Sequence, residues 1–297
     1  MRIPSLPNGD ATVLRAPRGP GAPAPAPALS RQRWIGPLKV GLSISGYVVL
    51  VVILWWGIST GLFWLPGGDT HIWDRAGDTL RAGGEVYAIQ PLRNETIWYA
   101  PPFVVIFAAV SWLPLEVTYV AIVALEVAAL RYLAGSWLAF GWACLFPLTA
   151  FELVSGNFNM LVAAAIVAAI SRRPAAATIM SFAKLSPILA VHPRDWRVVA
   201  LTAAIMFAIT IPWIGLWPVW VAHLAAAYGQ PLGPQIPIPF AVRAVVAVIL
   251  LVIFRPWSRA LAAFVAIPAM YWSSLVVLLA PVAVILRRLP RPSDDAR

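Results

Sequence analysis

Charged residues are scarce in this sequence, and their scarcity excludes a water-soluble globule. Asp, Glu, Lys and Arg make up 11% of the 297 residues, whereas 61% are apolar and the mean hydropathy is +0.80. Soluble domains carry about 25% charged residues. Because about 20 apolar residues cross a bilayer, this length holds roughly 8–10 membrane segments, and we predict an all-α, polytopic membrane helical bundle.

Cysteine and acidic residues are also few. The single cysteine, Cys144, excludes an internal disulfide framework and a Cys-rich metal site. Lys and Arg outnumber Asp and Glu by 22 to 12, but most of the central basic residues stand singly or in pairs between apolar runs. This spacing indicates membrane topology, so membrane lipids and not nucleic acid are the expected partners. The sequence offers no candidate metal site and indicates no cofactor.

The sequence divides into a tail, an apolar domain and a second tail. Residues 1–38 are rich in Pro, Ala, Gly and Arg, which predicts a disordered tail. The uncharged run 40–65 is too long for the apolar region of a signal peptide and is expected to remain as the first membrane helix. Residues 39–288 would form the transmembrane domain, with 66–101 as an external loop, and 289–297 a second tail. Both tails are predicted to be cytoplasmic, because the Arg pairs between later runs then face the cytoplasm too.

Several apolar runs after the external loop do not fit a single membrane span. Residues 102–113 would measure about 18 Å, too short for a ~30 Å core, and predict a re-entrant or interfacial helix. The further runs are 115–133, 137–151, 159–170, 175–191, 198–216, 240–254 and 261–286. The charge pattern requires two of them to be hairpins, broken near 184–187 and 268–272. Because broken helices are tolerated only where the freed backbone lines a cavity, we expect both breaks to face one outward cavity roofed by the external loop.

The external loop contains the pattern of a short amphipathic helix. Its apolar face consists of Ile72, Trp73, Ala76 and Leu80. The charged residues fall mostly on the other face: His71, Asp74, Arg75, Asp78 and Arg81. Asp69 is a candidate N-cap, and the pair Gly83-Gly84 would end the helix. We predict that this helix lies at the membrane surface.

The external loop and two later turns resemble a family of membrane enzymes. The loop carries Asp69, Trp73, Ala76, Gly84 and Tyr87, followed by Tyr99-Ala100-Pro101-Pro102. The later turns are Ser155-Gly156-Asn157-Phe158-Asn159 and Ala183-Lys184-Leu185-Ser186-Pro187. In this order they resemble the integral-membrane glycosyltransferases of the GT-C superfamily, and most closely glycosyltransferase family 87. That family includes mannosyltransferases that use polyprenyl-phosphate-mannose.

The resemblance implies a fold, a reaction and a set of site residues. The chain would have a GT-C-like fold and sit in the cell membrane with its active site on the outer face. It would transfer a hexose from a polyprenyl-phosphate donor to a glycan or glycolipid hydroxyl, with inversion. Mannose is the first candidate for this hexose. The resemblance marks Asp69 as the general base. The expected substrate cavity contains Trp73, Tyr87, Tyr99, Asn157, Asn159 and His223.

The chemistry of this reaction points to the same kinds of residue. The acceptor hydroxyl must lose a proton as the glycosidic bond forms, and the leaving phosphate needs cations around it. Lys184 lies in an apolar run, where a lone cation is costly unless it has a function, and Arg243 begins an inward span. We predict both as ligands of the donor phosphate, because a guanidinium binds phosphate through two N–H groups.

Structural explanations remain open for the same residues. Asp69 is also explained as an N-cap alone, and Lys184 as a side chain that snorkels to the interface. His223 is more often a structural residue in such a position. For the whole chain, the alternatives are a secondary transporter and a non-catalytic membrane scaffold for envelope glycan assembly. We find no internal repeat of the kind that transporters show.

Three glutamates lie in the apolar runs. We expect Glu116 and Glu126 to make structural pairs, with Arg131 near Glu126. Glu152 ends its run, and the sequence leaves it open between a role in the cavity and exposure at the membrane interface.

Overall fold

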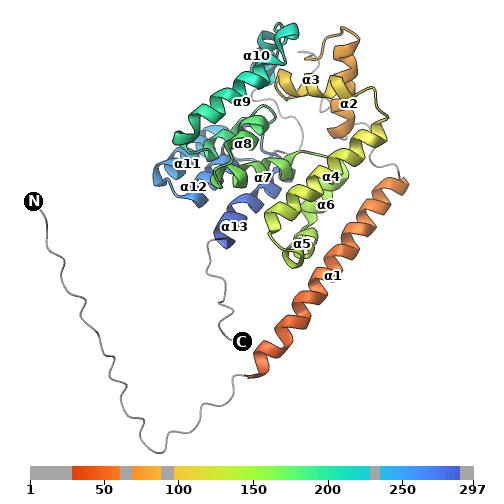
Figure 1. The fold of residues 1–297 in the computed structure, drawn as a ribbon, viewed down its shortest axis with the longest axis vertical. Coiled ribbons are helices and arrows are strands. Elements are labelled where there is room, and N and C mark those ends of the chain that lie inside the picture. The colour runs from red at the N-terminus through yellow and green to blue at the C-terminus, as the bar shows by residue number, and fades with distance from the viewer. Residues whose placement is uncertain (1–28, 61–68, 88–96, 228–234, 288–297) are drawn as a thin grey trace, which may run out of the picture. The chain divides into compact units, whose positions relative to one another are not determined.

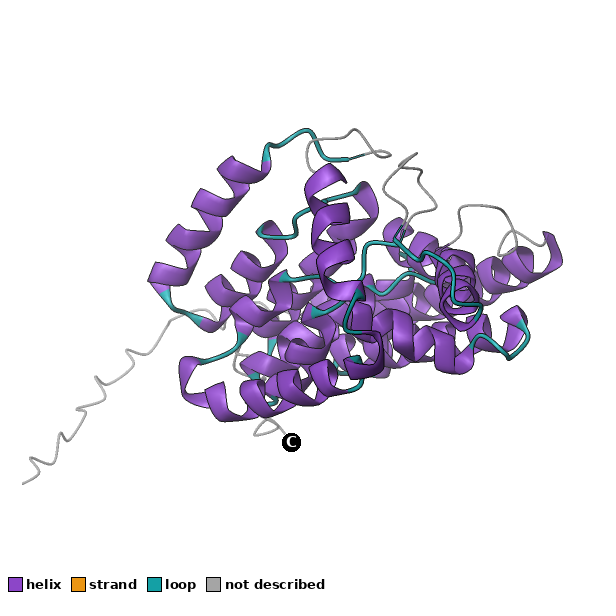
Figure 2. Cartoon of the chain, turned by 90° about the horizontal axis from the view of Figure 1, so that it is seen from above, coloured by secondary structure: helices purple, strands orange, loops and turns teal. Residues whose placement is uncertain are grey.

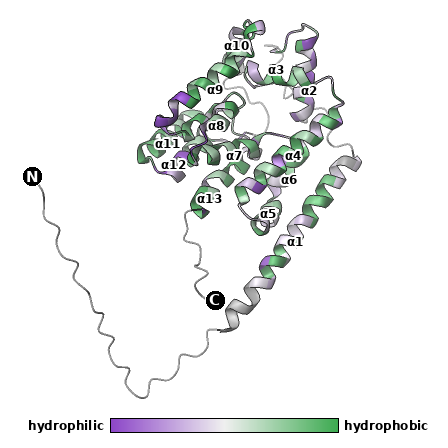
Figure 3. Ribbon diagram, viewed as in Figure 1, coloured by the Kyte–Doolittle hydropathy of each residue, from purple (hydrophilic) through white to green (hydrophobic). Residues whose placement is uncertain are grey.

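A computed structural model describes residues 29–60, 69–87, 97–227 and 235–287. These ranges form helices joined by loops, without a named strand (Figure 1, Figure 2). The all-α class predicted from the sequence is therefore confirmed for the described residues. Figure 3 shows hydrophobic residues over most of these helices and hydrophilic residues gathered on α2 (Asp69–Arg81).

Two helices are long and apolar enough to cross a membrane. They are α1 (Leu29–Thr60), through its segment Gly36–Gly57, and α4 (Leu115–Ala134). A third span results if α5 (Trp137–Cys144) and α6 (Pro147–Ser155), which are bent by 83° at their junction, count as one broken span. The chain thus has the helices of a membrane protein, and the larger number of segments expected from the sequence stays a prediction.

The first helix begins earlier than the sequence predicted. Helix α1 starts at Leu29, so residues 29–38 are helical, and the disordered tail predicted over 1–38 is wrong for this part. Extending an existing helix adds one hydrogen bond per residue, whereas starting one is costly, so the apolar span can extend helical structure toward its N-terminus. Residues 1–28 and 288–297, with the rest of the predicted tails, lie outside the described residues.

The amphipathic helix predicted within residues 66–101 is confirmed as α2. Its buried side includes Ile72, Trp73, Ala76 and Leu80, the apolar face that the spacing predicted. The helix stops where Gly83 adopts φ = +71°, and the N–H of Gly84 donates to the carbonyl oxygen of Thr79 at 2.8 Å. Helix α2 packs against α3 (Pro101–Val110), the short apolar helix predicted over 102–113.

The two predicted helix breaks are also confirmed. The first separates α8 (Pro174–Ser181) from the 3-10 helix η2 (Ser186–Ala190). The second separates α12 (Pro256–Val265) from η5 (Trp272–Leu278) and α13 (Leu279–Leu286). The remaining elements are α7 (Asn159–Ile170), η3 (Pro193–Asp195), α9 (Trp196–Ala208), η4 (Ile211–Trp213), α10 (Leu216–Ala227) and α11 (Phe240–Ile253). A further break, between α9 and α10 around Pro212, was not predicted.

Helix α7 lies at the centre of the hydrophobic core. It contacts α4, α8, α12 and α13, and side chains on it such as Met160, Val162 and Ile166 have no exposed surface. By contrast, α11 presents large apolar side chains outward, among them Val252, which is 80% exposed. An apolar side chain left so open is stable in contact with lipid, in agreement with a membrane location.

Candidate functional site

A buried polar cluster lies near the centre of the fold. It consists of Asp69, Glu126, Glu152, Asn159 and Lys184, which interact through hydrogen bonds or electrostatically. Glu126, Glu152 and Asn159 have no exposed surface, whereas Asp69 and Lys184 are partly exposed. The cluster is therefore closed on its glutamate side, and Asp69 and Lys184 form its mouth.

The side-chain amide of Asn159 joins the inner and outer parts of this cluster. Its Nδ2 donates to Oε1 of Glu152 at 2.7 Å, and its Oδ1 accepts a hydrogen bond from Nζ of Lys184. The Lys184 ammonium also interacts electrostatically with Glu152, then Asp69, then Glu126, in decreasing strength. Glu152 thus orients Asn159, and Asn159 holds Lys184 next to Asp69.

The turn between α6 and α7 determines how these segments meet. Gly156 ends α6 with φ = +62°, and a Cβ atom there would lie 2.3 Å from Oγ1 of Thr70 in the first turn of α2. A glycine is therefore required both by the backbone conformation and by the close approach of α2. This contact brings the start of α2, which carries Asp69, against the turn that carries Glu152 and Asn159.

The break after α8 supplies Lys184. The N–H of Lys184 closes the end of α8 by donating to the carbonyl oxygen of Met180 at 2.9 Å. Two residues before Lys184, the carbonyl oxygen of Phe182 accepts a hydrogen bond from the N–H of Ala100 at 2.8 Å. This bond fixes Ala100 and the preceding Tyr99 beside the break.

Two carboxylate oxygens of the cluster stay without a hydrogen bond. Glu126 accepts from the backbone N–H of Leu161, in the first turn of α7, through Oε1 at 3.4 Å. Among the described residues, Oε2 of Glu126 and Oε2 of Glu152 have no hydrogen-bond partner, although both are buried. Leaving a buried carboxylate oxygen unpaired is expensive, and such groups gather at functional sites.

Aromatic side chains form one wall of the cluster. Trp73 stacks on Phe158 with ring centres 4.0 Å apart, and Tyr99 lies 5.6 Å from Trp73. Burial raises the pKa of the Tyr99 phenol, and the carboxylates of Asp69, Glu152 and Glu126 raise it further, so this hydroxyl stays protonated. Because Trp73 is only 2% exposed and forms a side-chain hydrogen bond with Tyr99, it supports Tyr99 from within the core.

The surroundings of Asp69 change the pKa of its carboxyl. Burial raises the pKa of its carboxyl to about 6, and the Lys184 ammonium opposes part of that rise. A carboxylate with this pKa is ionised at neutral pH and is still a stronger base than an exposed one. Asp74 and Asp78 lie further along α2. Asp78 pairs with Arg81 at 3.6 Å on the exposed face, as the sequence predicted.

Other predicted cavity residues lie around the cluster or serve local structure. The Tyr87 hydroxyl donates to the carbonyl oxygen of Tyr99 at 2.7 Å, which steadies the backbone at Tyr99. The fully buried His223 packs against Tyr87 and Trp98, with ring centres 5.9 and 5.0 Å apart. Asn157 accepts a hydrogen bond from the N–H of Phe158 through Oδ1 at 2.7 Å, so it shapes the turn before α7.

Arg243 occupies a position that does not suit the predicted phosphate ligand. Its guanidinium donates to the carbonyl oxygens of Ile238, Val265, Ile267 and Pro268. These bonds use four of its five N–H groups, so too few remain to bind phosphate through two of them. Three of the acceptors lie at the end of α12 and in the break that follows. Arg243 therefore satisfies backbone groups freed by the broken helix.

Sequence reasoning misplaced Glu126 and left out Tyr271. Glu126 points to the start of α7, whereas the Arg131 guanidinium lies 4.6 Å from the centre of the Trp137 ring, so the predicted pair of Glu126 and Arg131 is wrong. Tyr271, in the second break, interacts electrostatically with Asp69 and was not singled out. The sequence feature that marks Glu126 as a candidate site residue is its place in an apolar run, where a carboxylate is costly.

The chemistry available at this site is proton transfer and the binding of an anion. Asp69 can accept a proton, Tyr99 can donate a hydrogen bond, and Lys184 can neutralise a phosphate. Within the described ranges, no three His, Cys, Asp or Glu side chains are placed to hold a metal ion together. Comparison with protein-family models, with curated proteins and with solved structures finds no match to the chain.

Proposed function

We propose that the chain is an integral-membrane glycosyltransferase of the GT-C type. It transfers a hexose from polyprenyl phosphate to a hydroxyl of a glycan or glycolipid. Mannose is the first candidate for this hexose. The observation that carries this proposal is that Asp69 interacts electrostatically with Lys184, and Lys184 is held by the hydrogen bond to the buried Asn159. The two residues come from distant segments, and a base next to a cation is what transfer from a lipid phosphate requires.

The reaction is a single displacement at the anomeric carbon of the hexose. The acceptor oxygen forms the new glycosidic bond while the bond between the anomeric carbon and the phosphate oxygen breaks. The acceptor proton goes to the carboxylate of Asp69, and the bonding electrons leave with polyprenyl phosphate. Lys184 stabilises the charge that grows on this phosphate, and inversion follows because the acceptor attacks from the opposite face.

Asn159 and Glu152 act as positioning residues in this proposal. A lysine side chain has several rotatable bonds, and an ammonium next to Asp69 could otherwise fold onto the carboxylate. The hydrogen bond from Lys184 to Asn159, which Glu152 holds in turn, fixes the position of the ammonium. Such support around a reacting group is what makes its geometry reproducible.

The proposal includes a multi-pass arrangement with the site at the outer face. Apolar helices of 10–17 residues, such as α3, α7 and α11, add to the two long candidate spans. Joined across the breaks, they supply the broken segments that we propose to surround the site. With the basic residues of the loops in the cytoplasm, α2 and Asp69 lie outside.

Cysteine labelling tests this topology. Single cysteines at Thr79 and at Ser293, in a Cys144→Ala background, are treated with a membrane-impermeant reagent in whole cells. We expect Thr79→Cys to be labelled in intact cells and Ser293→Cys only after permeabilisation. Equal labelling of both positions in intact cells would refute the arrangement.

A transporter is the second candidate, and the two unpaired glutamate oxygens favour it. Glu126 and Glu152 lie close enough to repel each other, and such a pair can hold a proton that moves with a substrate. A proton-coupled transporter would move its solute across a liposome membrane in response to a pH gradient and would release no polyprenyl phosphate.

The deciding experiment uses purified protein in liposomes with polyprenyl-phosphate-[¹⁴C]mannose and a glycolipid acceptor. We expect labelled glycolipid to appear together with polyprenyl phosphate, and only when the acceptor is present. Asp78→Asn, on the exposed face of α2, should leave the rate unchanged, whereas Asp69→Asn should remove it. Movement of labelled donor without product would support the transporter instead.

A further inference from the structure

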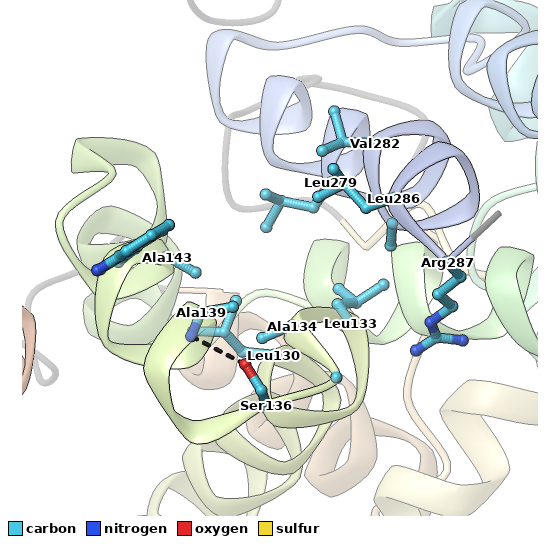
Figure 4. A pocket seen from close by; sticks show the side chains of 13 residues that line it. Leu130, Leu133, Ala134, Ser136, Ala139, Ala143, Leu279, Val282, Leu286 and Arg287 are labelled. Atoms are coloured by element: carbon cyan, nitrogen blue, oxygen red, sulfur yellow. Dashed lines mark hydrogen bonds between the residues drawn. The ribbon is translucent and has the colours of Figure 1, made fainter. Parts of the chain in front are cut away.

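A pocket of about 600 Å³ lies between α4, α5 and α13 (Figure 4). Its volume falls within the roughly 300–1,000 Å³ that ligand pockets occupy. Apolar residues make up nearly the whole lining, and Arg287 and Ser136 supply the polar groups. At its rim, Val282 is 48% and Leu286 60% exposed, so the apolar wall continues onto the outer surface of the protein.

Basic and aromatic side chains gather at the end of this pocket that carries Arg287. The Arg287 guanidinium lies 4.7 Å from the centre of the Tyr132 ring and donates to the carbonyl oxygen of the same residue. The Arg131 guanidinium lies over Trp137, whose side chain is 64% exposed. Aromatic rings paired with cations at the ends of apolar helices are typical of the depth of lipid headgroups.

We propose that this pocket binds an anionic phospholipid, with an acyl chain along the apolar walls and the phosphate at Arg287. Among the described residues, the Arg287 guanidinium donates a single hydrogen bond, to Tyr132, which leaves N–H groups for phosphate oxygens. Basic pockets between membrane helices bind such headgroups. A zwitterionic lipid offers the same chains but adds a cation that Arg287 repels.

This lipid site shares helix α4 with the buried polar cluster but contains none of the cluster's residues. The cluster member on α4 is Glu126, and the nearest pocket-lining residue, Leu130, lies four residues or about 6 Å further along the helix, at 1.5 Å per residue. A bound acyl chain would fill the space between α13 and the pair α4 and α5, and would hold these helices together whatever reaction the protein catalyses.

Native mass spectrometry of the purified full chain in detergent tests the proposal. The probes are phosphatidylglycerol and phosphatidylcholine with identical palmitoyl and oleoyl chains. We expect tighter binding of phosphatidylglycerol. Arg287→Gln should weaken this binding roughly tenfold, the loss expected for one charge-assisted hydrogen bond. The matched variant Arg197→Gln, which removes an exposed arginine at the start of α9, should leave it unchanged.

A second pair of variants tests whether the acyl chain enters the pocket. Ala139→Phe, which places a ring in the pocket, should reduce binding of phosphatidylglycerol and remove its stabilising effect on thermal unfolding. Ala128→Phe, on an exposed part of α4 outside the pocket, should do neither. Equal binding of the two lipids, equal losses for Arg287→Gln and Arg197→Gln, or unchanged binding in Ala139→Phe would each overturn the proposal. Tighter binding of polyprenyl phosphate than of phosphatidylglycerol would overturn the choice of a diacyl lipid.

Discussion

Replacing Asp69 with asparagine separates the two roles that the sequence allows for this residue, general base and helix cap. Asparagine keeps a side-chain oxygen that can cap a helix, but its amide does not accept a proton at neutral pH. We expect Asp69→Asn to lower the turnover of hexose transfer by about 10²–10⁴-fold, the usual contribution of a positioned base, while the protein stays folded.

The same substitution should stabilise the folded protein above pH 6. Burial raises the pKa of the Asp69 carboxyl from 3.8 to about 6, so ionisation costs more in the folded chain than in the unfolded one. A raised carboxyl pKa contributes stability below about pH 4 that is lost as the pH rises through about 6. A rise of this size corresponds to about 3 kcal/mol, and partial exposure of Asp69 reduces the expected gain to about 1–2 kcal/mol.

Initial rates of transfer between pH 5 and pH 8 and thermal unfolding in detergent at both ends of this range measure the two effects. With a pKa of about 6, the wild-type rate should fall roughly tenfold for each pH unit below 6, because only the carboxylate accepts the acceptor proton. The unfolding temperature of Asp69→Asn should exceed that of the wild type at pH 8, with about half that difference at pH 5. Near-wild-type transfer by Asp69→Asn, or a lower unfolding temperature at pH 8, would refute the assignment.

Three further substitutions test the surroundings of Asp69. Lys184→Met should weaken binding of polyprenyl-phosphate-mannose and lower turnover, measured by equilibrium binding and initial rates, whereas Arg173→Met on an exposed turn should do neither. Asn159→Leu should lower the free energy of unfolding by about 2–3 kcal/mol, measured in denaturant, because it leaves Oε1 of the buried Glu152 unpaired. Gly156→Ala should lower the unfolding temperature more than Gly135→Ala. Both glycines have positive φ, but only at Gly156 would the added Cβ meet Thr70. Equal shifts for the two alanine variants would contradict the close approach of α2.

The features that the sequence predicted well are those determined by nearby residues. Helix α2 was recognisable because an apolar face repeats with helical spacing and Gly83 can adopt the positive φ that ends it. The break at Lys184 was recognisable because a cation and a proline interrupt an apolar run that the charge pattern needed as a hairpin. In each case the relevant energy, of a backbone conformation or of a charge in an apolar run, belongs to the residue and its immediate neighbours.

The partners of buried polar groups were not predictable in the same way, because they depend on which helices pack together. Arg131 follows Glu126 by five residues, and this proximity in the sequence predicts a pair. Five residues along a helix, however, place two side chains more than 100° apart, so they meet different neighbours. Glu126 therefore meets the start of α7, and Arg131 the ring of Trp137. Arg243 likewise met the freed carbonyl oxygens of a break.

The buried polar cluster explains why Asp69 and Lys184 belong to one site although each has a simpler explanation alone. A capping aspartate does not need a lysine beside it, and a lysine that snorkels to the interface does not need a buried asparagine to hold it. In the fold, Glu152 holds Asn159, Asn159 holds Lys184, and Lys184 interacts with Asp69. Each of these groups costs free energy to bury, and together they cost more than apolar residues of similar size would. A chain that retains such an arrangement next to a partly exposed carboxylate has the constellation expected of a functional site, because stability alone would favour its replacement.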